Sequence, residues 1–217
     1  MKARYRVSRR IIVAVAVVLV AASASAQGNT SADSTYAQML ARLRAGDTTI
    51  DFQGFRVAYA HSSAYDPMSA ARTALRQRMN AALSTGDSKT AALRADSLLA
   101  GNYTDINAHV IGASLANQAG NQTLAKQHAA IARGLVRSLD LDHRGGSPGR
   151  AILLIDPDEE NVYGMVTGLQ RTAKYNTAAC GEQVCDFSVF HDPRSGRDTT
   201  IVFDMTLIAH KVLGAKP

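Results

Sequence analysis

The sequence predicts an α+β fold, with about six antiparallel helices followed by a small, mainly antiparallel sheet and one or two further helices. Over residues 33–140, apolar side chains recur at three- and four-residue steps, which is the helical period. Over residues 151–217, short apolar runs alternate with turn residues, which is typical of paired strands. A glycine-rich stretch over 141–150 separates the two patterns, so we expect a helical-repeat region, a connector and an α+β region.

Stop and start signals divide the helical-repeat region into six segments. Gly46 and Gly86 each follow an apolar periodic run, as glycines do at helix C-termini. Asp66 is the expected N-cap of the third helix, because Pro67 is favoured at a first helical position. The helices are expected near residues 34–45, 51–61, 67–84, 88–99, 104–119 and 122–139.

One internal repeat supports an arrangement of helical hairpins. Gly86-Asp87 and Gly120-Asn121 lie 34 residues apart, and an alanine-rich helix follows each pair. This is the period of tetratricopeptide-type hairpins, in which small residues let antiparallel helices pack closely. The aromatic signature of that repeat is absent, so we expect degenerate, tetratricopeptide-like hairpins.

The α+β region is expected to begin with a compact apolar strand over Ala151–Ile155. Asp156-Pro157 is expected to cap a short helix running to about Thr167, with acidic residues in its first turn, where the helix dipole favours them. Three antiparallel strands are expected near residues 169–176, 184–191 and 199–205, followed by a final helix near 206–212.

Residues 1–26 have the three parts of a cleavable signal peptide. Five basic residues precede an apolar run over 11–22, and Ala24-Ser25-Ala26 supplies a small-residue cleavage site. The apolar run is about 12 residues long, whereas a helix needs roughly 20 to cross a bilayer, so we expect no stable membrane span after cleavage. The protein is therefore expected to be exported, periplasmic or extracellular, with residues 27–32 as a disordered lead-in.

The net charge of +6 is concentrated in this leader. Residues 1–26 hold five of the 24 lysines and arginines and none of the 18 acidic residues, so the remaining chain carries +1. The sequence has no tryptophan and no basic patch interleaved with aromatic residues. We therefore expect no nucleic-acid partner.

The two cysteines, Cys180 and Cys185, lie in a turn-rich segment between two expected strands. In an oxidising compartment, such a pair is expected to form a disulfide across the hairpin. Two thiols alone do not make a zinc site, and the spacing differs from the C-x-x-C motif of redox catalysts.

Several short motifs span nearly all of the chain after residue 26. They are Gly46-Asp47-Thr48-Thr49, Tyr59 through Tyr65-Asp66-Pro67, Ala108-His109, the Gly-Ser linker at 145–147, Ile152 to Gly168, Cys185-Asp186-Phe187 and Val202-Phe203-Asp204. In these motifs the chain resembles an exported bacterial family, that of the domain of unknown function number 4919. It departs from the family pattern at Met68 and Val202, where the family usually has an aromatic residue and a tyrosine. The resemblance implies bacterial export and helices before sheet, and it brings no activity, substrate or catalytic residue.

Residues 145–149 match the G-x-S-x-G pattern of serine hydrolases, which requires a strand before the serine and a helix after it. In this sequence a helix is expected before the motif and a strand after it. Pro148, directly after Ser147, also lacks the backbone N–H that helps to build an oxyanion hole. We interpret the motif as a flexible connector.

His109 and His128 lie on the apolar faces of consecutive expected helices. A hairpin turn at 120–121 offsets the two histidines by about four residues, which is roughly 6 Å along the helix axes. A shared metal ion would also need a third ligand, and the sequence indicates none. We expect histidines of the core or of a groove, where one could contact a ligand. We expect no metal and no other cofactor.

Four carboxylates, those of Asp156, Asp158, Glu159 and Glu160, are concentrated at the start of the short helix. Such a cluster can bind calcium or supply an acid and a base, although the spacing fits no calcium loop. Helix capping and the helix dipole explain the same residues without a ligand. Asp158 and Glu159 are kept as candidate site residues beside the two histidines, and no residue is assigned as catalytic.

Two functions follow as hypotheses from these observations. The leading one is a non-enzymatic binding or assembly module of the cell envelope with a protein partner, because stacked helical hairpins offer a large surface for binding. The alternative is a hydrolase-like enzyme whose site lies where the helices meet the sheet. That site would draw on His109, His128, His143 and the acidic cluster at 156–160.

Overall fold

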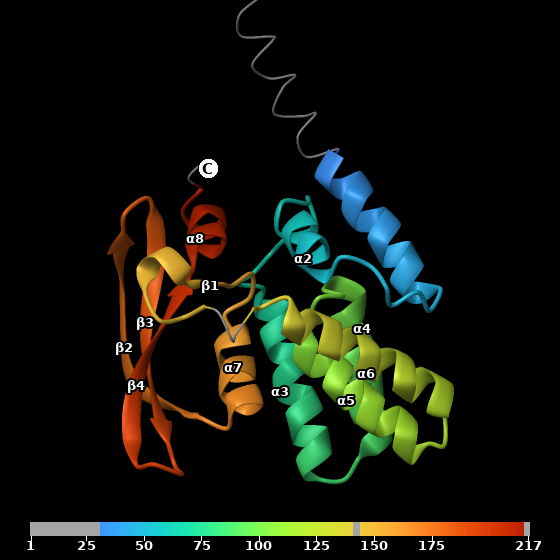
Figure 1. Ribbon diagram of the computed structural model, residues 1–217. Helices are drawn as coiled ribbons and strands as arrows, with labels where there is room; N and C mark the ends of the chain where they lie inside the picture. The colour runs from blue at the N-terminus through green and yellow to red at the C-terminus, as the bar shows by residue number, and fades with distance from the viewer. Residues whose placement is uncertain (1–30, 141–143, 215–217) are drawn as a thin grey trace, which may run out of the picture.

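A computed structural model describes residues 31–140 and 144–214 and confirms the α+β class. Within these ranges, six helices precede the sheet (Figure 1). They cover residues 31–44, α2 (Phe52–Ala60), α3 (Ala70–Ser84), α4 (Ser88–Gly101), α5 (Ile106–Gln118) and α6 (Gln122–Arg137). The first helix already includes residues 31 and 32, which we predicted as lead-in, and the predicted signal peptide lies outside the described residues.

The repeat found in the sequence corresponds to two helical hairpins with matching turns. Gly86 closes α3 with φ +75° and Gly120 follows α5 with φ +77°, a left-handed conformation that glycine adopts without strain. The next residue is an N-cap in both cases: the Asp87 side chain accepts from the Thr90 amide, and the Asn121 side chain from the Leu124 amide. Each hairpin turn therefore ends one helix and begins the next within two residues.

The predicted start of the third helix is wrong. The N-cap of α3 is Ser69, whose hydroxyl accepts from the Arg72 amide, and Pro67 lies in a turn before the helix. Tyr65 gives the reason, because its buried hydroxyl donates to the Ile155 carbonyl at 3.0 Å. This contact with a distant segment holds the chain in a turn where the local sequence favours a helix start.

The sheet has the strand order β1-β4-β3-β2, and only β1 is parallel to its neighbour. A short 3-10 turn, η1, covers Pro148–Arg150 before the first strand. The elements that follow are β1 (Ile152–Leu153), α7 (Glu159–Thr167), β2 (Gln170–Cys180), β3 (Gln183–Asp192), β4 (Arg197–Asp204) and α8 (Thr206–Leu213). The predicted Cys180–Cys185 disulfide is confirmed and joins β2 to β3 at their hairpin.

One residue of the predicted connector, Gly145, is hydrogen-bonded to the sheet. Gly145 accepts a hydrogen bond from the Val202 amide of β4 at 2.9 Å. It has φ +91°, and a β-carbon there would stand 3.0 Å from side-chain carbons of both Ile152 and Ile201. Glycine is therefore required at 145 by conformation and by space.

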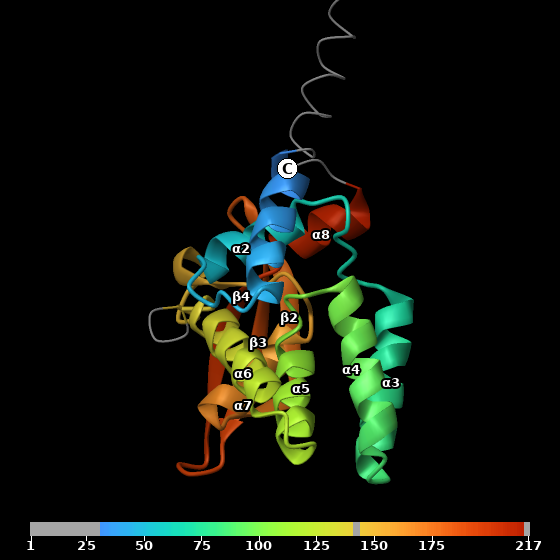
Figure 2. The ribbon, with the colours of Figure 1, turned by 90° about the vertical axis from the view of Figure 1, so that its right-hand side faces the viewer.

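Helices α7 and α8 lie between the sheet and the N-terminal helices, as Figures 1 and 2 show from two directions. The largest buried apolar cluster draws on both regions of the chain. It includes Leu43, Phe55, Ile131 and Leu135 from the helices, and Ile152, Tyr163, Phe190 and Phe203 from the C-terminal part. The helices and the sheet therefore share one core.

Among the described residues, no helix combines the length and the apolar character needed to cross a membrane.

Candidate functional site

A groove of about 550 Å³ lies between α4, α5 and α6. Figure 2 shows these helices on the side facing the viewer. Small residues explain the groove, because they leave the space between the helices unfilled; they are Ala92, Ala95, Gly112, Ala116 and Ala119. Leu115 and Leu124 add larger apolar surface. The polar lining residues are Ser88, Lys89, Asp96, Gln118, Asn121 and His128.

The two candidate histidines meet at the floor of this groove. Their Nδ1 atoms are 2.9 Å apart, so one donates a hydrogen bond to the other. His109 is fully buried behind His128, and its Nε2–H donates to the Tyr103 carbonyl at 3.1 Å. His128 is 7% exposed and lines the groove.

The two side chains bridge the offset that we expected between the histidines along the helix axes. Gly112 stands one turn after His109 on α5, and the ring of His128 lies where a side chain at 112 would be. A β-carbon at 112 would be 3.3 Å from Nε2 of His128. The glycine thus gives the imidazole room to reach across to its partner.

Burial keeps both imidazoles neutral near pH 7. Removal from water lowers the pKa of His109 from 6.5 to about 4, and the neighbouring His128 adds to this effect. Burial also lowers the pKa of His128, against the attraction of Asp96. The pair is therefore a network of neutral hydrogen bonds at the floor of an apolar groove.

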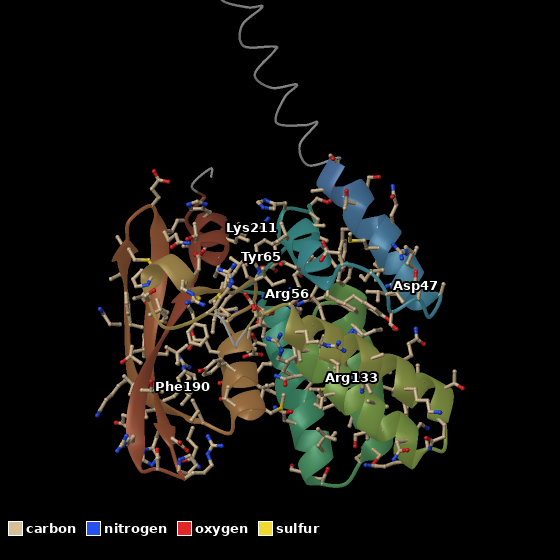
Figure 3. All side chains as sticks on the ribbon, viewed as in Figure 1. Asp47, Arg56, Tyr65, Arg133, Phe190 and Lys211 are labelled. Atoms are coloured by element: carbon tan, nitrogen blue, oxygen red, sulfur yellow. A yellow bond between two sulfur atoms is a disulfide. The ribbon has the colours of Figure 1, made fainter. Side chains whose placement is uncertain are left out.

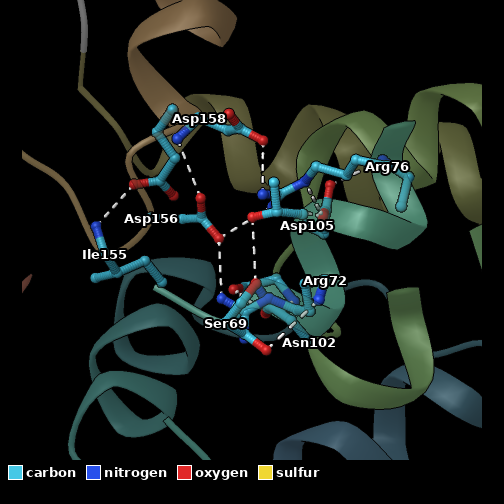
Figure 4. A network of polar contacts seen from close by, with 12 residues as sticks. Ser69, Arg72, Arg76, Asn102, Asp105, Ile155, Asp156 and Asp158 are labelled. Atoms are coloured by element: carbon cyan, nitrogen blue, oxygen red, sulfur yellow. Dashed lines mark hydrogen bonds and ion pairs between the residues drawn. The ribbon is translucent and has the colours of Figure 1, made fainter. Parts of the chain in front are cut away.

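The acidic cluster is in a different part of the fold and binds arginines (Figure 4). Asp156 accepts from Arg72 and Arg76 at 3.5 and 3.0 Å, and Arg76 also pairs with Asp158 at 2.7 Å. Asp156 is not the predicted N-cap of α7: its Oδ1 accepts from the Asp158 amide, and Asp158 holds the cap position without a side-chain cap bond. The other carboxylate oxygen of Asp156, Oδ2, faces Arg72 and Arg76 of α3.

Burial raises the pKa of Asp156 to about 6, although Arg76 partly opposes this. The cavity beside Arg76, Asp156 and Asp158 is about 10 Å³, which is at most the space of one water molecule. The cluster therefore has no room for a ligand and connects the helical region to the C-terminal part.

Glu159 forms a buried, two-pronged ion pair with Arg56 of α2, the central labelled residue of Figure 3. The Arg56 Nε and Nη2 atoms donate to the two carboxylate oxygens at 3.1 and 2.7 Å. The Ile155 amide donates to Glu159 at 2.8 Å, and Arg56 also donates to the Leu153 carbonyl. Glu159 therefore connects the start of α7 to α2 and to the segment that precedes α7.

The structure brings His109 and His128 together but keeps them apart from the acidic cluster. No hydrogen bond within residues 31–140 and 144–214 joins either histidine to Asp158 or Glu159. The same ranges hold no group of three or more side chains suited to a metal ion. His143 lies outside the described residues.

Sequence reasoning missed the arginine partners and the role of Gly112. Arg56, Arg72 and Arg76 lie on predicted helices, where a charged residue is ordinarily placed on the solvent face. The role of Gly112 could have been suspected from the sequence, because a glycine inside a helix costs stability and so suggests that another group packs closely against it.

Comparison of the chain with protein-family models, with curated proteins and with solved structures found no match.

Proposed function

We propose that the protein is a non-enzymatic binding module of the cell envelope, and that the groove between α4, α5 and α6 holds a short apolar segment of a partner protein. The observation that carries this proposal is the groove itself, with about 550 Å³ of space and a mainly apolar lining. Ligand sites in proteins have this size and this mixture of apolar surface with a few polar groups.

The charges along the groove support a peptide as the occupant. Lys89 and Asp96 both line it and are seven residues apart on α4, which is about 10 Å along a helix. An extended peptide advances about 3.3 Å per residue, so roughly three residues fit between the two charges. At this separation Lys89 can donate to a backbone carbonyl and Asp96 can accept from a backbone amide of the same short segment.

The polar groups of the groove support binding rather than hydrolysis. A hydrolase needs a base that is held by an orienting group and lies within reach of a nucleophile. In the described chain, the groove histidines bond to each other and to a backbone carbonyl, and none bonds to a groove carboxylate. The serine of the G-x-S-x-G motif lies far along the chain, in the turn before β1.

Export and the resemblance to family 4919 remain predictions and form part of this proposal. The Cys180–Cys185 disulfide supports export, because such bonds persist in oxidising compartments. N-terminal sequencing of the protein purified from a bacterial periplasm or medium is expected to begin at Gln27. A chain that keeps Met1 and remains in the cytoplasm would contradict it.

The binding proposal is tested by selecting displayed peptides on the folded protein. We expect the selected peptides to share an apolar core of about three residues. Ala92→Phe, which fills the half-buried groove side of α4, is expected to remove their binding. Leu93→Phe is the matched control, because Leu93 is 55% exposed and faces away from the groove lining. Peptides that bind Ala92→Phe as well as the parent would overturn the proposal.

A further inference from the structure

We infer that the groove selects an aromatic side chain that carries a hydrogen-bond donor, a tryptophan or tyrosine of the partner segment, and that Nε2 of His128 accepts this hydrogen bond. The inference rests on the proposed function and deepens it, because it names the chemistry that the groove recognises.

The hydrogen-bond network fixes the position of each proton. The Tyr103 carbonyl can only accept, so the neutral ring of His109 carries its proton on Nε2. Its Nδ1 is then a lone pair, and the Nδ1 of His128, 2.9 Å away, must be the donor. The neutral ring of His128 therefore has its remaining lone pair on Nε2, and this atom is an acceptor.

That acceptor is left open toward the groove. Within residues 31–140 and 144–214, no hydrogen bond to the Nε2 of His128 is formed. Gly112, which also lines the groove, has no side chain to cover the atom, whereas a β-carbon at 112 would stand 3.3 Å from it. The absence of a side chain at 112 leaves a fixed acceptor accessible to a groove ligand.

The surroundings of the acceptor determine which donor fits. Leu115, Leu124 and the groove alanines present apolar surface, whereas Asp96 is exposed and forms no hydrogen bond to His128. A cation that donates to Nε2 of His128 would exchange its hydration for a neutral acceptor, which is unfavourable. A serine or threonine hydroxyl brings too little apolar area to fill the space. Tryptophan and tyrosine combine a large apolar ring with one N–H or O–H donor, which matches one acceptor in an apolar groove.

The proton positions can be tested without any ligand. Long-range ¹H–¹⁵N correlation spectra of the histidine-labelled, disulfide-intact protein at pH 7 are expected to show His109 protonated on Nε2 and His128 on Nδ1. The opposite tautomer of His128 would overturn the inference, because Nε2 would then be a donor.

Donor recognition is tested with two small probes of the same shape. Indole has an N–H donor, and benzothiophene has the same fused rings without one. We expect indole to bind about fivefold more tightly, as one hydrogen bond predicts, and to shift the Nε2 resonance of His128. Equal binding of the two probes, or binding of neither, would overturn the inference.

Gly112→Ala provides a variant that keeps both histidines. The added methyl group is expected to cover Nε2 and remove the preference for indole, while the helical circular dichroism is unchanged. If Gly112→Ala prefers indole over benzothiophene as strongly as the parent does, the inference that a ligand reaches Nε2 of His128 through the groove is overturned. The peptide selection with Ala92→Phe does not depend on the two small probes. If the probes fail and the peptides still bind in the groove, the further inference is overturned and the proposed function is not.

Discussion

His109 is held in the neutral form by burial, and this has a consequence for acid solutions. Its pKa is lowered to about 4, so when pH falls below the ordinary value of 6.5 the unfolded chain takes up the proton and the folded chain does not. The lost stability accumulates from pH 6.5 down to 4 and amounts to about 3 kcal/mol. We expect the Cε1–H resonance of His109 to remain unchanged between pH 7 and 5.

The protonation of His109 has to be followed through its own resonance, because the pH dependence of overall stability also contains the contributions of other groups. Asp156, whose pKa is raised to about 6, acts in the opposite sense, because its contribution to stability is present in acid and is lost as pH rises through 6. A midpoint for His109 near the ordinary 6.5 would show that its ring is accessible to water.

Arg56 is a buried charged residue whose loss should cost much stability. Arg56→Met leaves the Glu159 carboxylate buried without its partner, and we expect a loss of about 3–5 kcal/mol in urea unfolding. Adding Glu159→Gln should recover part of this loss, because the charge is then removed. Arg42→Met is the control, since the Arg42–Asp47 pair is exposed to solvent and should contribute little to stability. An equal loss in the two single variants would contradict the role given to burial.

At the scale of elements, the contact between α2 and α6 depends on a glycine. A β-carbon at Gly134 would overlap the ring of Phe52, so we expect Gly134→Ala to destabilise the fold by about 1–3 kcal/mol despite its better helix propensity. Gly101→Ala, at the end of α4 with open space around it, should be neutral or stabilising. Thermal unfolding of both variants measures the difference, and Phe52→Leu should restore Gly134→Ala.

The β2–β3 hairpin has a local staple in the Cys180–Cys185 disulfide. The loop that it closes is short, so the chain-entropy estimate is about 2 kcal/mol. We expect the double variant Cys180→Ala with Cys185→Ala to remain folded with a lowered melting temperature. Complete unfolding of this variant at 25 °C would show that the disulfide is needed for the whole fold and not only for the β2–β3 hairpin.

The elements that the sequence predicted well are those whose ends are set by neighbouring residues. Asp87 and Asn121 cap α4 and α6 through bonds to amides three residues ahead, and both starts were predicted correctly. Asp66 and Asp156 have the same local signal, but distant partners decide their surroundings: the Ile155 carbonyl binds Tyr65, and arginines of α3 bind Asp156.

The candidate site was predictable only in part for the same reason. The helical periodicity placed His109 and His128 on apolar faces, and the structure puts both there. Their mutual hydrogen bond depends on the space left by Gly112, which a periodic pattern does not describe.

At the scale of the whole molecule, the shared core predicts one unfolding transition. Leu43 and Phe55 belong to the same buried cluster as Phe190 and Phe203, so neither region completes its apolar packing alone. We expect far-ultraviolet and tyrosine near-ultraviolet circular dichroism to report coincident transitions. A fragment of residues 27–140 should unfold without cooperativity; a sharp transition in this fragment would show that the helices form an independent domain.

The strand order also fixes when the fold can be completed. β4 lies inside the sheet between β1 and β3, although it is the last strand of the chain. Ile152 pairs with Phe203, which lies about 50 residues later in the chain, so β1 has no strand partner until β4 has been synthesised. The helices of the shared core therefore lack their partners on β4, Ile201 and Phe203, until that strand has been synthesised. The N-terminal helices therefore cannot reach their native packing one by one as they are made, and the sheet and the shared core are completed together.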